Sequence, residues 1–281
     1  VRSDGAVGYV DGRIETGENA VDSATKAAAE AKPAKIVGDD PEGDLSAVVF
    51  VGLTGDSKAD AGLVSYLKDS GIKATFALSA SDALENAQTL EAIIDAGFGV
   101  VSNGASGEDN LHTLATRDVV KTMLRSRESL SGAVNKPVSL MYCSGTRLTG
   151  DVLRAASASG YEALVQASDA HVLDEGSFTA SGDADAYVAS LTGQSVTVYD
   201  LRGPAAEASD EDAVSAEAPA IDKQPGLDDT QDAEETEELP DAVKQAEWLA
   251  DSFKSSGKKT ALLGELKSQD GYAELKAEAC S

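Results

Sequence analysis

Residues 45–76 contain the pattern that most restricts how this chain can fold. Residues 47–53 form a Val-rich apolar run that is too short and too β-branched for a helix, so they predict a buried strand. The apolar residues that follow recur at helical spacing, and Gly71 ends that helix. Residues 72–78 predict a second strand. Because a strand, a helix and a strand follow within about thirty residues, this stretch forms one βαβ unit with parallel strands.

The alternation of strands and helices continues along the chain. Further strands are predicted at residues 98–101, 137–142, 161–165, 195–199 and 259–263, and helices at 81–96, from 116, at 149–159, at 186–191 and from 242. Such sustained alternation indicates a parallel α/β domain, either a barrel or a doubly wound sheet. In both architectures the loops after the carboxyl ends of the strands carry the chemistry.

The composition divides the chain into three parts. Residues 1–44 are weakly periodic and predict a linker or stalk, with a short helix at 20–31. Residues 45–267 form the domain, interrupted at 205–241 by an acidic insertion. This insertion is interpreted either as a solvated, mobile loop or as an arm that binds cations or a partner. Residues 268–281 form a C-terminal tail.

Charge and cysteine content exclude several functions. The formal net charge of −26 argues against electrostatic binding of nucleic acid or an anionic membrane surface. No apolar run is long enough to span a membrane. Cys143 and Cys280 define neither a disulfide framework nor a zinc site, although one bridge between them stays open. Because the chain begins with Val1, we expect an extracytoplasmic protein, secreted or anchored to the cell envelope through a removed N-terminal segment.

Several segments resemble one known family. They are VVFVGLTGDS at 48–57, GIKATF at 71–76, EAIIDAGFGVVSNGAS at 91–106, NKPVSLMYCSG at 135–145, LRAASASGYEALV at 153–165 and QSVTVYD at 194–200. In order and spacing they are similar to the polysaccharide deacetylase (NodB-homology) family. The resemblance implies a distorted, TIM-like (β/α) barrel of seven or eight units. It also implies hydrolysis of acetyl groups on cell-wall or other polysaccharides with a divalent metal such as zinc.

The resemblance also assigns roles to individual positions. The family's catalytic base falls on Asp56, which is kept, whereas its metal-binding carboxylate falls on Ser57. Its two metal-binding histidines fall on Asn103 and Gly107, and its histidine acid falls on Asp200. A zinc site needs nitrogen, sulfur or carboxylate donors in a set of at least three. The implied positions therefore predict that no metal cofactor is bound and that Asp56 is a vestigial base.

Other family positions have changed as well. The family's arginine falls on Met141, its tyrosine on Ser144, with Gly145 kept, and its Trp-Asp pair on Gln166 and Ala167. The chain contains two histidines, His112 and His171, which we interpret as surface or hydrogen-bonded loop residues rather than metal ligands.

Three functional hypotheses follow. The first is a catalytically degenerate deacetylase-like module that binds carbohydrate or has a structural role at the cell envelope. Its candidate binding residues are Asn103, Ser57, Tyr142 and Tyr199, its partner is a cell-wall polysaccharide, and its oligomeric state is left open. The second is an active hydrolase, or a deacetylase acting on C–N bonds, that uses a rebuilt carboxylate site. Its acids are Asp56, Asp169 and Asp200, for which turn and helix-cap roles are the alternative.

The third hypothesis is a nucleotide-binding α/β domain. It lacks a glycine-rich phosphate loop with the required spacing. A nucleophilic role for Cys143 is also disfavoured, because no histidine has an evident reason to lie beside it. Aromatic residues make up 5% of the chain, which is few for a carbohydrate groove.

Overall fold

The βαβ unit that the sequence predicts is present at the centre of the structure. The computed structural model describes residues 8–10, 13–15, 17–105, 110–202 and 241–270. Strand β4 (Leu45–Val51) leads into helix α2 (Ser57–Ser70), and strand β5 (Ala74–Leu78) follows. The two strands are parallel, as predicted. Gly71 ends α2 with a φ of 76°, a left-handed conformation that glycine adopts without steric cost.

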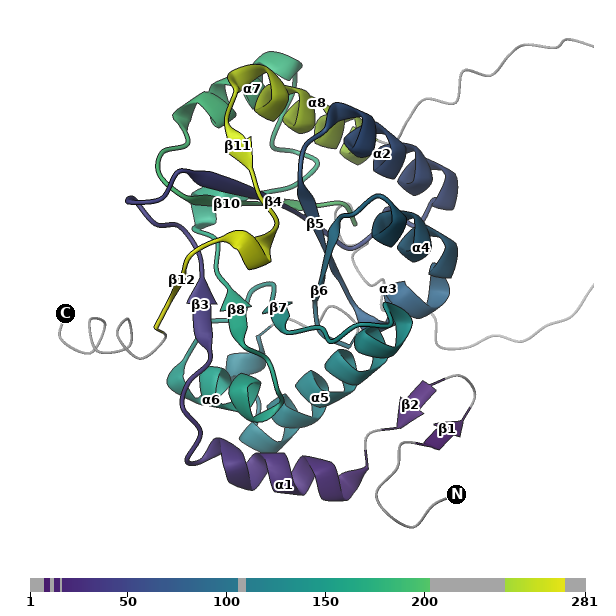
Figure 1. Cartoon of the computed structure of the whole chain (residues 1–281), viewed down its shortest axis with the longest axis vertical. Coiled ribbons are helices and arrows are strands. Elements are labelled where there is room, and N and C mark those ends of the chain that lie inside the picture. The colour runs from purple at the N-terminus through teal and green to yellow at the C-terminus, as the bar shows by residue number, and fades with distance from the viewer. Residues whose placement is uncertain (1–7, 11–12, 16, 106–109, 203–240, 271–281) are drawn as a thin grey trace, which may run out of the picture.

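These strands belong to one curled sheet with the order β12-β3-β8-β7-β6-β5-β4-β10-β9 (Figure 1). Its other strands are β3 (Lys35–Val37), β6 (Gly99–Ser102), β7 (Leu140–Tyr142), β8 (Ala163–Val165), β9 (Val172–Leu173), β10 (Ser195–Asp200), β11 (Lys259–Thr260) and β12 (Ser268–Gln269). Strand β11 pairs with the start of β4. Only β12 runs antiparallel to its described neighbour. The sheet curls into a half-barrel, which confirms the predicted distorted α/β barrel.

Helices cover the outside of this half-barrel (Figure 1). They are α1 (Glu18–Ala28), α3 (Ala80–Glu85), α4 (Ala87–Asp95), α5 (Thr116–Ala133), α6 (Gly150–Ala158), α7 (Ser181–Ser190) and α8 (Asp241–Ser256), together with α2. Side chains alternate between the two faces of a strand. Phe50 and Tyr199 therefore lie in the apolar layer beneath the helices. Val49 and Val198 lie in the apolar interior of the half-barrel.

Several predicted helices have different bounds in the structure. The helix expected at 81–96 is divided at Asn86 into α3 and α4, and Ser79 caps α3. The Ser79 hydroxyl accepts a hydrogen bond from the backbone N–H of Asp82, whose carboxylate accepts one from the N–H of Ser79. This reciprocal capping box fixes the start of α3. Helix α7 begins at Ser181 rather than at 186, and Thr116 follows the cap of α5.

Part of the segment predicted as a linker or stalk contributes to the sheet and its helical layer. Within residues 1–44, α1 packs against α5 and α6. Strand β3 pairs in parallel with β8 over three residues. A short hairpin, β1 (Gly8–Val10) with β2 (Arg13–Glu15), precedes α1. The helix predicted at 20–31 is confirmed as α1.

A seam of hydrogen bonds joins the two ends of the half-barrel. The side-chain Nε2 of Gln194 donates to the carbonyl oxygens of Gly38 at 2.8 Å and of Lys267 at 3.0 Å. Its Oε1 accepts from the backbone N–H of Lys267 at 2.9 Å. The backbone of Gln194 exchanges two further hydrogen bonds with Asp40. We call this set of contacts the barrel seam, because it connects residues beyond β3, before β10 and before β12.

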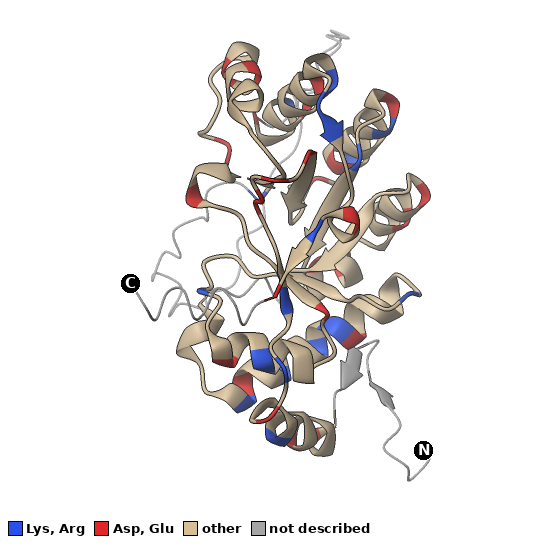
Figure 2. Cartoon of the chain, turned by 60° about the vertical axis from the view of Figure 1, so that its left-hand side comes forward, with Lys and Arg blue, Asp and Glu red and all other residues tan. Residues whose placement is uncertain are grey.

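Charged residues lie mainly on the helices and connecting loops, and the strands carry few of them (Figure 2). Most of the predicted acidic insertion, residues 205–240, falls outside the described residues, as does the end of the tail at 271–281. None of the helices in the described ranges is long and apolar enough to cross a membrane.

Replacement of Gln194 by alanine tests the seam. Gln194→Ala removes one buried and two partly buried hydrogen bonds, and leaves the carbonyl of Gly38 and both backbone groups of Lys267 without these partners. We expect the free energy of unfolding to fall by about 2–4 kcal/mol. Urea denaturation measures it, and Gln88→Ala, at an exposed position of α4, is the matched control. Equal stability of the two variants would contradict a structural role for the seam.

Candidate functional site

The candidate site lies where the parallel strands β4 to β8 and β10 end. Because these strands run in the same direction, the loops that follow them gather at one rim of the half-barrel. The sequence predicted site residues after β4, β6, β7, β8 and β10. Each of these residues lies at or after the end of its strand.

Asp56 caps helix α2. Its Oδ1 accepts hydrogen bonds from the backbone N–H groups of Lys58 at 2.9 Å and Ala59 at 3.2 Å. Ser57 is the first residue of the helix, and both side chains are exposed. A carboxylate at this position also complements the helix dipole. Asp56 is therefore observed as a helix cap, which is the alternative role that the sequence left open.

Asp60 is a buried carboxylate at the same helix terminus, and the sequence analysis missed it. It is 1% exposed, and its Oδ1 accepts from the backbone N–H of Thr54 at 3.0 Å and from the Thr54 hydroxyl at 2.8 Å. Its Oδ2 has no hydrogen-bond partner among the described residues. The pKa of Asp60 is raised, chiefly by burial and further by the negative charges of Asp56 and Asp82.

A sequence signal for Asp60 exists. The apolar stripe of α2 consists of Leu63, Val64 and Leu67, and Asp60 lies three, four and seven residues before them. It thus occupies a helix face that points to the core. An aspartate in such a stripe predicts either a buried hydrogen-bonded carboxylate or a functional group.

Asn103 follows β6 and is also buried without described partners. It is 1% exposed, and neither Oδ1 nor Nδ2 makes a hydrogen bond to a described residue. Its backbone N–H still donates to the carbonyl of Leu78 at 2.8 Å, which continues the pairing of β6 with β5. The position fixed by the backbone thus presents a neutral amide at the rim. Gly107 lies outside the described residues.

The residues around β7 are buried. Tyr142 is 6% exposed and packs in the interior of the half-barrel with Val101 and Val165. Cys143 is 7% exposed and packs in the outer apolar layer. Since Cys280 is not among the described residues, pairing of the two cysteines stays a prediction.

Tyr199 and Asp200, both predicted as site residues, lie at the end of β10 in different surroundings. Tyr199 points to the outer layer, where it is fully buried and meets Phe50 edge-on at 6.4 Å between ring centroids. Burial, followed by the negative charges of Glu175, Asp174, Asp200 and Asp241, raises the pKa of Tyr199. Tyr199 is thus part of the core in this structure, and a binding role for it stays a prediction.

Asp200 is held by a neighbouring arginine. Its two carboxylate oxygens accept from Nε of Arg202 at 2.9 Å and from a terminal guanidinium nitrogen at 2.6 Å. This bidentate pair fixes the orientation of the carboxylate. Gly52 makes room for it, because a Cβ at Gly52 would lie 2.4 Å from Cγ of Arg202.

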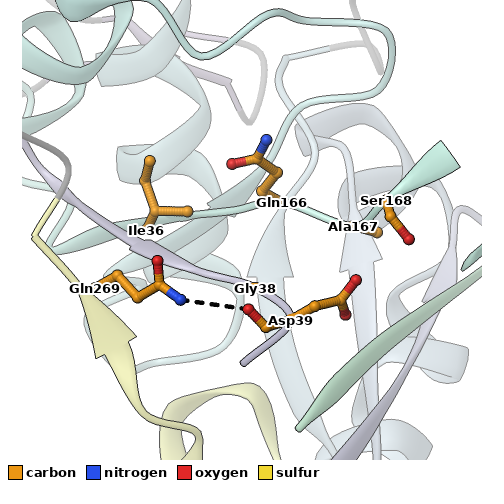
Figure 3. A pocket seen from close by; sticks show the side chains of 7 residues that line it. All are labelled: Ile36, Gly38, Asp39, Gln166, Ala167, Ser168 and Gln269. Atoms are coloured by element: carbon orange, nitrogen blue, oxygen red, sulfur yellow. Dashed lines mark hydrogen bonds between the residues drawn. The ribbon is translucent and has the colours of Figure 1, made fainter. Parts of the chain in front are cut away.

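The loop after β8 lines a pocket of about 190 Å³ (Figure 3). The lining residues are Ile36, Gly38, Asp39, Gln166, Ala167, Ser168 and Gln269. Asp169 follows Ser168 as the first residue of a 3₁₀ turn (Asp169–His171), and its side chain is exposed. The pocket thus lies beside the carboxyl ends of β3 and β8.

The described residues do not assemble the donor set of a family-type metal site. No group of three His, Cys, Asp or Glu side chains in the described ranges is close enough to hold a metal ion. His112 Nδ1 accepts from the backbone N–H of Arg147 at 3.2 Å, which agrees with the loop role expected for it. His171 Nδ1 lies 3.1 Å from Oδ2 of Asp39, although not in the direction of a hydrogen bond. Within the ranges that the structure describes, no donor set of the family's kind is therefore present.

Asp60→Asn tests the buried carboxylate. Because the pKa of Asp60 is raised in the folded state, its contribution to stability is largest below 3.8, its ordinary pKa, and is lost as the pH rises through the raised value. Asparagine keeps an acceptor for Thr54 but does not ionise. We expect Asp60→Asn to be at least as stable as the wild type at pH 7, with the difference shrinking toward pH 3.

Chemical denaturation across this pH range measures the effect. Asp95→Asn, at an exposed position of α4, is the control. A difference between Asp60→Asn and the wild type that does not change with pH would show that burial has not raised the pKa of Asp60.

Comparison with known proteins connects this fold to one family. A model of the polysaccharide deacetylase family matches residues 50–164. Among curated protein sequences, none matches at a significant level. Three similar solved structures are informative. A pseudoenzyme of carbohydrate esterase family 4 from Bacillus anthracis is 13% identical, with a TM-score of 0.59 over 85% of this chain and 70% of that chain. A mutant of it with restored enzymatic activity gives 13% identity and a TM-score of 0.60 over 85% and 72%.

The third structure is a family 4 carbohydrate esterase from Streptomyces lividans in complex with acetate. It is 13% identical, with a TM-score of 0.53 over 79% of this chain and 93% of that chain. At these identities the neighbours show the fold alone. The family model thus matches residues 50–164 of this chain, and the three solved structures share its fold.

Proposed function

We propose that this protein is a catalytically degenerate polysaccharide deacetylase-like protein. In this proposal it keeps the family's barrel and binds a cell-wall or related polysaccharide at the rim of the half-barrel without hydrolysing it. It acts outside the cytoplasm, where such polysaccharides are found. One observation carries the proposal: where the resemblance places a metal-binding histidine, the chain has Asn103, a buried amide with no described hydrogen-bond partner.

The chemistry of the remaining groups supports the loss of catalysis. A hydrolase of this kind needs a cation to activate water and a carboxylate free to accept its proton. The carboxylate of Asp56 caps α2, and that of Asp200 is paired with Arg202. An asparagine amide is a weak ligand for a borderline metal such as zinc, which prefers imidazole, thiolate and carboxylate.

Binding requires less of the site than catalysis does. A buried amide offers two N–H donors and one acceptor oxygen, which match the hydroxyl and amide groups of a sugar. Leaving such a group without a partner in the folded protein costs free energy, so a ligand that satisfies it gains that amount on binding. The B. anthracis neighbour, described as a pseudoenzyme, is a precedent for this fold without activity.

Metal content and acetate release test the catalytic part of this proposal. After incubation with zinc and desalting, we expect well under one zinc per chain by elemental analysis. We also expect no release of acetate from acetylated chitin oligomers or peptidoglycan fragments. A peptidoglycan N-acetylglucosamine deacetylase of similar fold serves as the positive control for acetate release from peptidoglycan fragments. Stoichiometric zinc, or acetate released above background, would overturn the proposal.

Co-sedimentation tests the binding part. We expect the wild-type protein to sediment with insoluble chitin or peptidoglycan, and Asn103→Ala to bind at least threefold less. Because Asn103 makes no described side-chain hydrogen bond, this variant should keep its melting temperature within a few degrees. Wild-type protein that stays in the supernatant with both polymers would refute a polysaccharide-binding role.

One observation favours an active hydrolase with a rebuilt carboxylate site as the second candidate. Asp60 is buried with a raised pKa near Asp56, and carboxylates with such contrasting environments often divide acid and base roles. The acid set predicted from the sequence is less favourable, because Asp56 caps a helix and Asp200 is paired. Hydrolysis that survives chelation but disappears in Asp60→Asn would select this alternative.

A further inference from the structure

The two residues that flank Asn103 in the chain belong to a closed ring of buried hydrogen bonds. Ser102 is the last residue of β6, and its Oγ lies 2.5 Å from Oγ of Ser126 on α5. The Oγ of Ser126 donates to the carbonyl oxygen of Gly104 at 2.7 Å, and the backbone N–H of Gly104 donates to Oγ of Ser102 at 3.3 Å. Both serines are 0% exposed. We call Ser102, Gly104 and Ser126 the serine ring.

The chemistry of these groups fixes the direction of every hydrogen bond in the serine ring. A serine hydroxyl has a single proton. Because Ser126 donates its proton to a carbonyl oxygen, the proton between the two serines comes from Ser102. The donors therefore follow one another in one sense, from the Gly104 N–H through Ser102 and Ser126 back to the Gly104 carbonyl. Hydrogen bonds in such a chain strengthen one another, so the loss of one weakens the others.

The serine ring is shielded from solvent. On α5, Met123 and Leu130 lie about one turn before and one turn after Ser126, and both are 0% exposed. The hydroxyl of Tyr161 donates to the carbonyl oxygen of Met123 at 3.2 Å, and burial is the chief cause of the raised pKa of Tyr161. A polar group that is freed from the ring therefore has no solvent to replace its partner, and this loss costs free energy.

Further contacts fix the backbone on either side of Asn103. The Asn103 N–H donates to the carbonyl oxygen of Leu78 at 2.8 Å, which continues the pairing of β6 with β5. On the other side, the Gly104 carbonyl also accepts from the N–H of Ala80, the first residue of α3, at 3.1 Å. Gly104 has a φ of 82°, a conformation that residues with a side chain rarely adopt. The start of the β6 loop is thus held by β5, α3 and α5 together.

Asn103 depends on this backbone for the orientation of its side chain. The residue is 1% exposed, and its amide makes no hydrogen bond to a described residue. Within the described part of the chain, the direction of the amide therefore follows from the backbone and from packing. A binding group has to be held to within about 0.5 Å of its working position, which requires support from the residues behind it.

We propose that the serine ring positions the Asn103 amide at the rim, with Ser126 as the positioning residue that ties it to α5. Ser126 acts through Gly104 and Asn103 and does not itself touch a ligand. When the ring is opened, the Gly104 peptide loses a partner and turns, so the Asn103 amide points in a different direction. The consequence for binding rests on the proposed function, whereas the direction of the amide is a property of the free protein.

A second buried pair of serines supplies a matched control. The Oγ of Ser195 donates to Oγ of Ser46 at 2.9 Å, and these residues are 0% and 4% exposed. They lie at the starts of β10 and β4, at the opposite end of these strands from the rim. Ser195→Ala thus removes a buried hydroxyl hydrogen bond of the same kind away from Asn103. It should lower stability without moving the amide.

NMR spectra of the isotope-labelled full chain test the proposal without a ligand. We expect the side-chain NH₂ signals of Asn103 to shift in Ser126→Ala and to keep their wild-type positions in Ser195→Ala. Ser102→Ala opens the same ring at another bond, so it should shift the same signals and make the Gly104 amide exchange with deuterated water at least tenfold faster. Each single variant tests the ring by itself, so one folded variant is sufficient. Unchanged Asn103 signals in a folded ring variant would overturn the proposal.

Co-sedimentation with chitin or peptidoglycan measures the consequence for binding. We expect Ser126→Ala to bind at least threefold less than the wild type, and Ser195→Ala to bind as the wild type does. Equal loss of binding in these two variants would assign the effect to stability rather than to position, and would overturn the proposal. If the wild type binds neither polymer, the proposed function fails, and the Asn103 signals still decide whether the ring positions the amide.

Discussion

The hydrogen bonds of Gln194 connect the two ends of the half-barrel, whose sheet does not close by strand pairing alone. Gln194 is 3% exposed, and its side chain makes three hydrogen bonds to the backbone of two other segments. Asp39 adds a carboxylate bond to the backbone of β10. Without these contacts several buried backbone groups would lose their partners, and each such loss costs free energy. The shape of the rim and of the pocket beside β3 and β8 both depend on this closure.

Two glycines show how closely the segments of the seam approach. A Cβ at Gly43 would lie 2.3 Å from Cβ of Gln194, and one at Gly193 would lie 2.6 Å from the carbonyl oxygen of Asp40. Gly193 also has a φ of 66°, which disfavours other residues. Packing at this distance leaves no room for a side chain at either position.

At the rim, polar residues that look catalytic in the sequence have structural partners. The carboxylates of Asp56 and Asp200 are both engaged by neighbours within three residues. Among the buried polar groups without described partners are Asp60 Oδ2 and the Asn103 amide. A site with such groups suits recognition through hydrogen bonds, and the proposed function follows from this contrast.

The sequence predicted the order of strands and helices well. The spacing of apolar residues and the glycines that end helices, such as Gly71, are local signals. It did not predict β3 within the sheet, since a three-residue strand has no periodicity of its own and is formed by pairing with β8. It did not show that Tyr199 faces the outer layer, because a one-residue step along a strand reverses the face. Asp60 was missed although it interrupts an apolar stripe, and the Arg202–Asp200 pair is formed by side-chain geometry that spacing alone does not determine.

The barrel seam also has a consequence for how the protein is made. Gln194 contacts residues 156 positions earlier and 73 positions later, and Asp39 contacts Gln269 across 230 positions. During synthesis the early strands can pair with one another, but the half-barrel cannot be completed until residues 267–269 have emerged. Such long-range closure slows folding. A nascent or truncated chain that ends before this point keeps an open sheet edge, so chaperones and proteases would meet the protein at that stage.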